Sequence, residues 1–137
     1  MSKAKLALIG LLLGTLLPGC ATQGNADVAT EAVVKFHHNL DQGLYQSILL
    51  EGDPEFKGNA FNATYLQKAH EVAGKVKNSV GGRVGSQAMG DEAQITMLYK
   101  TEFENYTASE TFVFGVKDGK ARLKFYEVKG LPGLSLD

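Results

Sequence analysis

The spacing of apolar residues along the chain changes once, from a helical period to a strand period. In residues 27–44 the apolar positions recur every three or four residues, as on one face of a helix. We therefore predict a helix from Asp27 that is capped by Asn25 and ends near Gly43. Its buried face is expected to hold Ala29, Ala32, Val33, Phe36, Leu40 and Leu44.

Two further helices are expected before the period changes. Residues 44–50 predict a short helix that ends before Pro54. A third helix is predicted from a cap at Asn62, with Phe61 and Leu66 spaced to pack on each other across that cap. Its buried face is expected to hold Tyr65, Ala69, Val72, Ala73 and Val76.

Apolar and polar residues alternate through the second half, which predicts strands at 93–103, 109–116 and 120–128. The glycine-rich residues 82–89 predict a weaker fourth strand, and Asp118-Gly119 is a type I′ hairpin signal. The inward positions are expected to be Ala93, Ile95, Met97, Tyr99, Thr101, Phe103, Phe112, Phe114, Val116, Ala121, Leu123 and Phe125. Helices followed by an antiparallel meander predict an α+β fold, with N-terminal helices packed on a curved antiparallel sheet of about four strands.

The first twenty residues have the layout of a secretory signal peptide. Two lysines precede an apolar run over residues 6–17, which is shorter than the roughly 20 residues of a membrane-spanning helix. The run ends in Leu17-Pro18-Gly19-Cys20, which resembles the lipobox of bacterial lipoproteins. The resemblance implies cleavage between Gly19 and Cys20 and attachment of acyl chains to Cys20. An ordinary signal peptide followed by a free cysteine is the alternative interpretation.

The residues after the cysteine bear on localisation. In the sorting rule of such lipoproteins an aspartate after the cysteine retains the protein in the inner membrane, and this chain has Ala21 there. We therefore expect a cell-envelope protein, lipid-anchored at the periplasmic face of the outer membrane, whose acylated Cys20 binds membrane lipid. The predicted organisation is a signal peptide at 1–19, a lipidated cysteine with a short tether at 20–25, one α+β domain at 26–129 and a tail at 130–137.

Charge and cysteine content exclude several classes of protein. Removal of residues 1–19 takes two of the 14 basic side chains and none of the 15 acidic ones, so the net charge falls from −1 to about −3. With no basic surplus, we expect no nucleic-acid partner. With Cys20 as the one cysteine, the fold has no disulfide framework and depends on its hydrophobic core.

Short motifs in the second half carry a second resemblance. Residues 99–105 (YKTEFEN), 110–112 (ETF), 118–120 (DGK) and 125–128 (FYEV), after three helices, look like the NTF2-like, or cystatin-like, α+β cone group. The nearest members are small secreted or lipid-anchored bacterial domains of unknown function. The resemblance covers about residues 27–128 and implies a cone whose interior holds a pocket. Members of this group include enzymes, binding modules and dimerisation domains, so the fold alone does not identify the function.

Candidate binding residues are those expected inside the cone. Seven of them form the expected pocket lining: Phe36, Leu40, Tyr65, Ile95, Met97, Tyr99 and Phe112. We expect no catalytic residue, no cofactor and no metal. The adjacent His37 and His38 would point about 100° apart on a helix and could not share an ion.

The sequence thus favours a membrane-anchored envelope lipoprotein whose domain is a non-catalytic protein-interaction or small-ligand-binding module. An envelope protein or a second copy bound at the outer face of the sheet is the expected partner. One alternative is a small NTF2-fold isomerase, dehydratase or hydrolase, which requires an acid or a histidine buried inside the cone. Another is an inhibitor or immunity-type protein that acts through residues 51–59.

Overall fold

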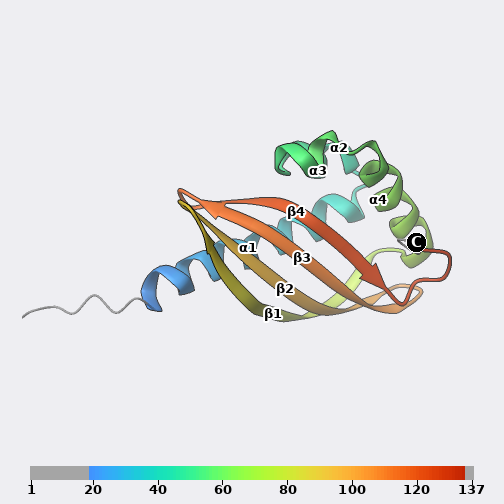
Figure 1. Cartoon of the computed structure of the whole chain (residues 1–137). Helices are drawn as coiled ribbons and strands as arrows, with labels where there is room; N and C mark the ends of the chain where they lie inside the picture. Colours follow the sequence, from blue (N-terminus) through green and yellow to red (C-terminus); the bar gives the residue numbers. More distant parts are fainter. Residues whose placement is uncertain (1–18, 135–137) are drawn as a thin grey trace, which may run out of the picture.

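A 23-residue helix crosses one face of a four-stranded antiparallel sheet in the computed structural model, which describes residues 19–134 (Figure 1). The elements are, in chain order, α1 (Gly19–Asp41), α2 (Tyr45–Leu50), α3 (Pro54–Gly58), α4 (Ala60–Ala73), β1 (Val76–Met89), β2 (Glu92–Phe103), β3 (Thr107–Lys117) and β4 (Lys120–Lys129). The chain is therefore an α+β fold with its helices before its strands, as the pattern of apolar residues predicts.

The sheet is a simple meander in the order β1-β2-β3-β4, and every neighbouring pair is antiparallel. The turn between β3 and β4 has positive φ at Asp118 (51°) and Gly119 (71°), which confirms the predicted type I′ hairpin. The predicted alternation of β2 is also confirmed, since Ile95, Met97 and Tyr99 are buried and Leu98 is exposed. These inward residues face α1, which contacts all four strands.

Helix α1 begins earlier than the sequence predicts. It starts at Gly19, so Asn25 lies within it and is not its N-cap. A side-chain hydrogen bond stabilises this first part of the helix, since Gln23 Nε2 donates to Asp27 Oδ1, one helical turn away, across 3.0 Å. The predicted tether at 20–25 is thus part of the helix. At its other end the helix stops where predicted, before Gly43 at φ 69°.

The sequence analysis missed α3 and placed the start of α4 too late. Asp53-Pro54 begins a helix here, because the Asp53 carboxylate accepts from the backbone N–H of Phe56 and proline fits the first helical position. Asn59 caps α4, so Asn62 lies inside the helix and the predicted Phe61–Leu66 contact across the cap is wrong. Residues 51–59, the alternative inhibitory segment, are therefore largely helical.

Helix α4 ends one residue before Gly74, whose φ is 78°. Val76 consequently belongs to β1 and not to the buried face of α4. Of the predicted face, Tyr65, Ala69 and Ala73 are buried and Val72 is partly buried, and Leu66 is buried in addition.

Strand β4 contains a β-bulge that reverses the predicted direction of its second half. Val113 pairs with Phe125 and Phe114 pairs with Leu123, so Lys124 is an extra residue. Leu123 points inward as predicted, but Phe125 is exposed and Tyr126 is buried. The expected inward position of Phe125 is wrong, because the extra residue of the bulge shifts the alternation of inward and outward side chains by one position.

The segment after β4 was predicted to be a tail, but residues of it pack on the domain. Leu131 is only 5% exposed and belongs to the hydrophobic core, and Leu134 is partly buried against that core. A backbone hydrogen bond from the N–H of Leu134 to the carbonyl of Leu131 closes the turn between them. Residues 130–134 therefore contribute to the domain.

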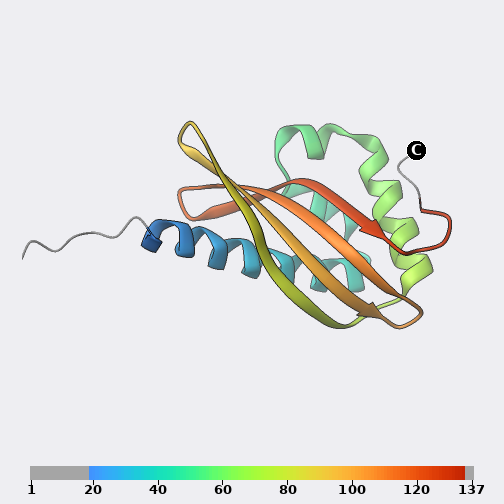
Figure 2. The same ribbon diagram turned by 60° about the horizontal axis from the view of Figure 1, so that its bottom comes forward.

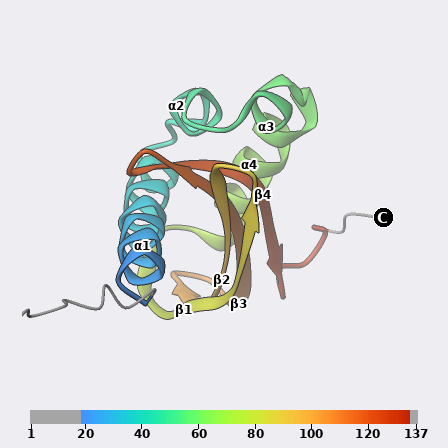
Figure 3. The same ribbon diagram turned by 60° about the vertical axis from the view of Figure 1, so that its left-hand side comes forward.

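The domain has two different ends. The start of α1 and the turns of the β1–β2 and β3–β4 hairpins lie at one end, and α4 lies at the other (Figures 1 and 2). Figure 3 shows α2 and α3 above the β4 side of the sheet. A parallel bridge between Gly52 and Leu123 ties the α2–α3 connection to β4. None of the helices within residues 19–134 is long and apolar enough to cross a membrane.

Candidate functional site

A fully buried carboxyl group, that of Glu110, lies in the core between α1 and the sheet. The His37 Nε2 lies 2.8 Å from Glu110 Oε1, and Thr101 donates its hydroxyl to the same oxygen. The Tyr126 hydroxyl donates to the other oxygen, Oε2, across 2.6 Å. The Ser79 hydroxyl lies 2.8 Å from that of Thr101 and extends the network to β1. The three direct partners of Glu110 offset the cost of burying its carboxylate.

Five elements, α1 and all four strands, bring this cluster together. Glu110 and Thr101 stand on inward positions of β3 and β2, so the two-residue period that buries Phe112 also buries Glu110. Phe112 was predicted at an inward position and Glu110 was not, although both lie on the same side of the alternation. His37, considered above only for a metal site, is buried against Glu110. Tyr126 was missed because of the bulge.

The network perturbs the two nearby phenols. Burial raises the pKa of Tyr126 well above 10, and the charge and hydrogen bond of Glu110 raise it further. Burial also raises the pKa of Tyr99, a hydrogen bond with Thr30 lowers it, and the charge of Glu110 raises it. Both phenols therefore keep their protons near neutral pH, and the Tyr126 hydroxyl stays a donor to Glu110.

The seven residues predicted to line a pocket form the packed core. All are buried, and Phe36 contacts Phe112 with ring centroids 5.0 Å apart. Tyr99 also packs edge-on against Phe112, at 5.9 Å. A cavity of about 30 Å³ lies beside Phe36 and the small residue Ala32, with room for about one water molecule. Leu40, Ile95 and Met97 are at most 1% exposed.

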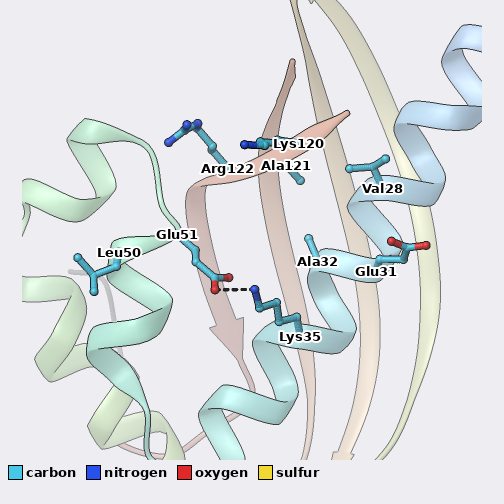
Figure 4. Close-up of a pocket in the computed structure, with 9 residues that line it drawn as sticks. All are labelled: Val28, Glu31, Ala32, Lys35, Leu50, Glu51, Lys120, Ala121 and Arg122. Carbon is cyan, nitrogen blue, oxygen red and sulfur yellow. Dashed lines mark ion pairs between the residues drawn. The ribbon is translucent and has the colours of Figure 1, made fainter. Parts of the chain in front are cut away.

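A larger open groove lies outside this core, between α1, the end of α2 and the start of β4 (Figure 4). Its volume is about 420 Å³, within the usual size of a small-ligand site. Its apolar lining comes from Val28 and Ala32 of α1, Leu50 of α2 and Ala121 of β4. The sequence analysis did not predict this groove, because the helix–strand approach that forms it depends on the tertiary packing.

Charged side chains surround the groove. Lys35 and Glu51 form an ion pair of 2.7 Å that joins α1 to the end of α2 (Figure 4). Lys120 and Arg122 lie on β4, and neither forms an ion pair with another described residue. Glu31 lies on α1. The groove thus combines an apolar surface with two cations that are available to an anionic group.

Residues 1–18 of the predicted signal peptide lie outside the described residues, whereas Gly19 and Cys20 form the first positions of α1. Within the described part of the chain, no three His, Cys, Asp or Glu side chains gather closely enough to hold a metal ion.

The chain was also compared with known proteins. It matches no protein-family model, no curated protein and no solved structure.

Proposed function

We propose that the protein is a lipid-anchored envelope protein whose domain is a non-catalytic NTF2-like module that binds a small amphiphile in the groove between α1 and β4. Cys20, the residue proposed to carry the lipid, and the groove residue Val28 belong to the same helix. Eight residues of helix separate them by about 12 Å. The groove would therefore open close to the membrane, on the periplasmic face of the outer membrane.

The chemistry of the groove supports this ligand class. Val28, Ala32 and Ala121 offer an apolar surface. Beside it, Lys120 and Arg122 offer positive charge that pairs with no carboxylate among residues 19–134. A molecule with a short alkyl body and one anionic group satisfies both features. The observation that carries the proposal is this open, partly apolar groove on α1, the helix that contains Cys20 near its start.

The anchor is tested by the intact mass of the protein from membranes of its host. Cleavage before Cys20 with added acyl chains is expected, and a Cys20→Ser variant should lack both changes. An unmodified Cys20 in the membrane-derived protein would contradict the anchor.

Ligand binding is tested separately with octanoate as the probe, by calorimetry on the full-length protein. The double change Lys120→Ala and Arg122→Ala should weaken binding at least tenfold. Lys75→Ala removes an exposed lysine outside the groove and is the matched control. Octanoate binding that is absent, or equal in both variants, would contradict the ligand class and leave the anchor standing.

The outer face of the sheet supports the proposal of a protein partner or a second copy. Leu98 of β2 is exposed there. Val80 of β1 is also exposed, and it pairs with Lys100, the next outward residue of β2 after Leu98. Analytical ultracentrifugation of the wild type and of a Leu98→Lys variant tests self-association at this face, which the variant should reduce.

A small enzyme of the NTF2-like fold is the second candidate. Glu110, His37 and Tyr126 are the buried acid, histidine and phenol that such an enzyme requires, and Tyr126 also lines an open cavity. Turnover in a panel of isomerase, dehydratase and hydrolase substrates that is lost in a folded Tyr126→Phe variant would favour this candidate over the binding module.

A further inference from the structure

A second open cavity, of about 270 Å³, lies where α3 and α4 meet β4, and it shares no lining residue with the groove between α1 and β4. Two aromatic rings at its wall are largely exposed, with Phe61 at 52% and Phe125 at 41%. Tyr65 stacks on Phe61 with ring centroids 5.8 Å apart. Aromatic rings that face solvent across a cavity are a common feature of ligand sites.

Two independent local features place these rings outside the core. The bulge at Lys124 turns Phe125 outward where an unbroken strand would bury it. The cap at Asn59 places Phe61 in the first turn of α4, on a side that does not face the sheet. Each phenylalanine leaves about half of its surface in water and so forgoes part of the stabilisation that full burial would supply. The fold therefore presents both rings at a cost in stability.

Two asparagine side chains beside the rings are fixed by the fold. Asn59 Oδ1 accepts from the backbone N–H of Phe61 at 3.0 Å, and Asn62 Nδ2 donates to the carbonyl of Phe56 at 2.9 Å. These bonds use one atom of each amide. The remaining Nδ2 of Asn59 and Oδ1 of Asn62 supply one donor group and one acceptor at the wall of the cavity.

The local charge disfavours anionic ligands. Lys124 lines the cavity, but its ammonium lies 3.4 Å from Asp53 Oδ2 and 3.3 Å from Glu92 Oε2. Glu55 adds a third carboxylate at the wall. With three carboxylates around one ammonium, a phosphate or carboxylate ligand would meet net repulsion.

We propose that this cavity binds one ring of a neutral sugar, with the sugar face against Phe61 and Phe125 and its hydroxyl or acetamido groups on Asn59 and Asn62. The weakly positive C–H groups on the face of a sugar ring suit the negative face of an aromatic ring. The edge of the same sugar ring carries donors and acceptors, which match the fixed amides. The site is separate from the groove, so it stands or fails independently of the proposed function.

The test is calorimetric titration of the full-length protein with triacetylchitotriose and with maltotriose. Binding of at least one of the two sugars is expected, with affinity lowered at least tenfold in Phe61→Ala and in Phe125→Ala. Because both side chains are exposed, both variants should fold, and circular dichroism checks this. Val34→Ala removes an exposed apolar side chain that lines neither the cavity nor the groove, and it should leave the sugar affinity unchanged.

Three results would overturn the proposal. The first is that neither sugar binds at millimolar concentration. The second is sugar binding that the two phenylalanine variants leave intact. The third is binding of choline chloride that both variants abolish while neither sugar binds, which would identify the site as one for a cation.

Discussion

The hydroxyl of Tyr126 lies 2.6 Å from the carboxylate of Glu110, although an unbroken alternation of β4 would direct that phenol to solvent. One extra residue, Lys124, turns the second half of the strand over. The same bulge exposes Phe125 beside the cavity at α3 and α4. A single backbone irregularity thus directs Tyr126 into the buried network and exposes Phe125 at the wall of a candidate binding site.

The first prediction concerns the strength of this hydrogen bond. Tyr126→Phe removes one donor to a buried carboxylate and should lower the free energy of unfolding by about 1.5–3 kcal/mol. Glu110→Ala should lower the free energy of unfolding further, by about 3–5 kcal/mol, because it leaves several buried polar groups without their hydrogen-bond partner. Denaturant unfolding measures both. Tyr106→Phe changes an exposed tyrosine and is the control, and an equal effect of Tyr126→Phe and Tyr106→Phe would contradict the prediction.

The second prediction follows from the raised pKa of Tyr126. Above pH 10, the usual pKa of tyrosine, the unfolded chain loses this proton while the folded protein keeps it. The stabilisation is therefore complete below pH 10 and is lost as the pH rises toward the folded-state pKa. The free energy of unfolding should fall by about 1.4 kcal/mol per pH unit for each such tyrosine.

A Tyr126→Phe variant should show a shallower fall in this alkaline range. The slope should not vanish, because burial raises the pKa of Tyr65 and Tyr99 as well. Denaturant unfolding at a series of pH values on either side of 10 gives the slopes for both proteins. Parallel slopes in the wild type and the variant would show that Tyr126 titrates normally.

Periodicity predicts regular elements well in this chain. The inward faces of β2 and of most of β3 follow from alternation alone, and the turn at Asp118-Gly119 follows from the need for positive φ. Alternation fails at Lys124 because the extra residue is recognisable only from the pairing of β3 with β4. Fold class was therefore predictable, and the placement of Tyr126 was not.

The candidate sites were less predictable than the fold. The groove and the cavity form where helices meet β4, and such contacts between distant segments have no local sequence signal. Glu110 did carry a signal, two residues before Phe112, but a charged residue at an inward position is normally read as a break in the pattern. Its burial is explained by partners from α1, β2 and β4, which only the folded chain brings together.

The third prediction uses two adjacent glycines of β1. A Cβ at Gly81 would lie 2.1 Å from the carbonyl oxygen of Leu98 and 2.7 Å from the Cα of Tyr99. Since both atoms belong to the backbone of β2, Gly81→Ala should push the strands apart and cost about 1–3 kcal/mol or more. At Gly82 a Cβ meets no atom within 4 Å, so Gly82→Ala should be neutral or slightly stabilising. Similar melting temperatures for the two variants would contradict this difference.

The fourth prediction concerns the segment after β4, which the sequence suggested is a tail. Leu131 is buried in the core, so Leu131→Ala should lower the free energy of unfolding by about 2–4 kcal/mol. Leu50→Ala makes the same chemical change at a position that is 63% exposed and should stay within about 0.5 kcal/mol of the wild type. Truncation after Gly130 removes Leu131 and Leu134 together and should destabilise the domain at least as much as Leu131→Ala. Denaturant unfolding of the three variants measures these free energies. If the segment were a dispensable tail, the truncated protein would be as stable as the full-length chain, which would contradict the prediction.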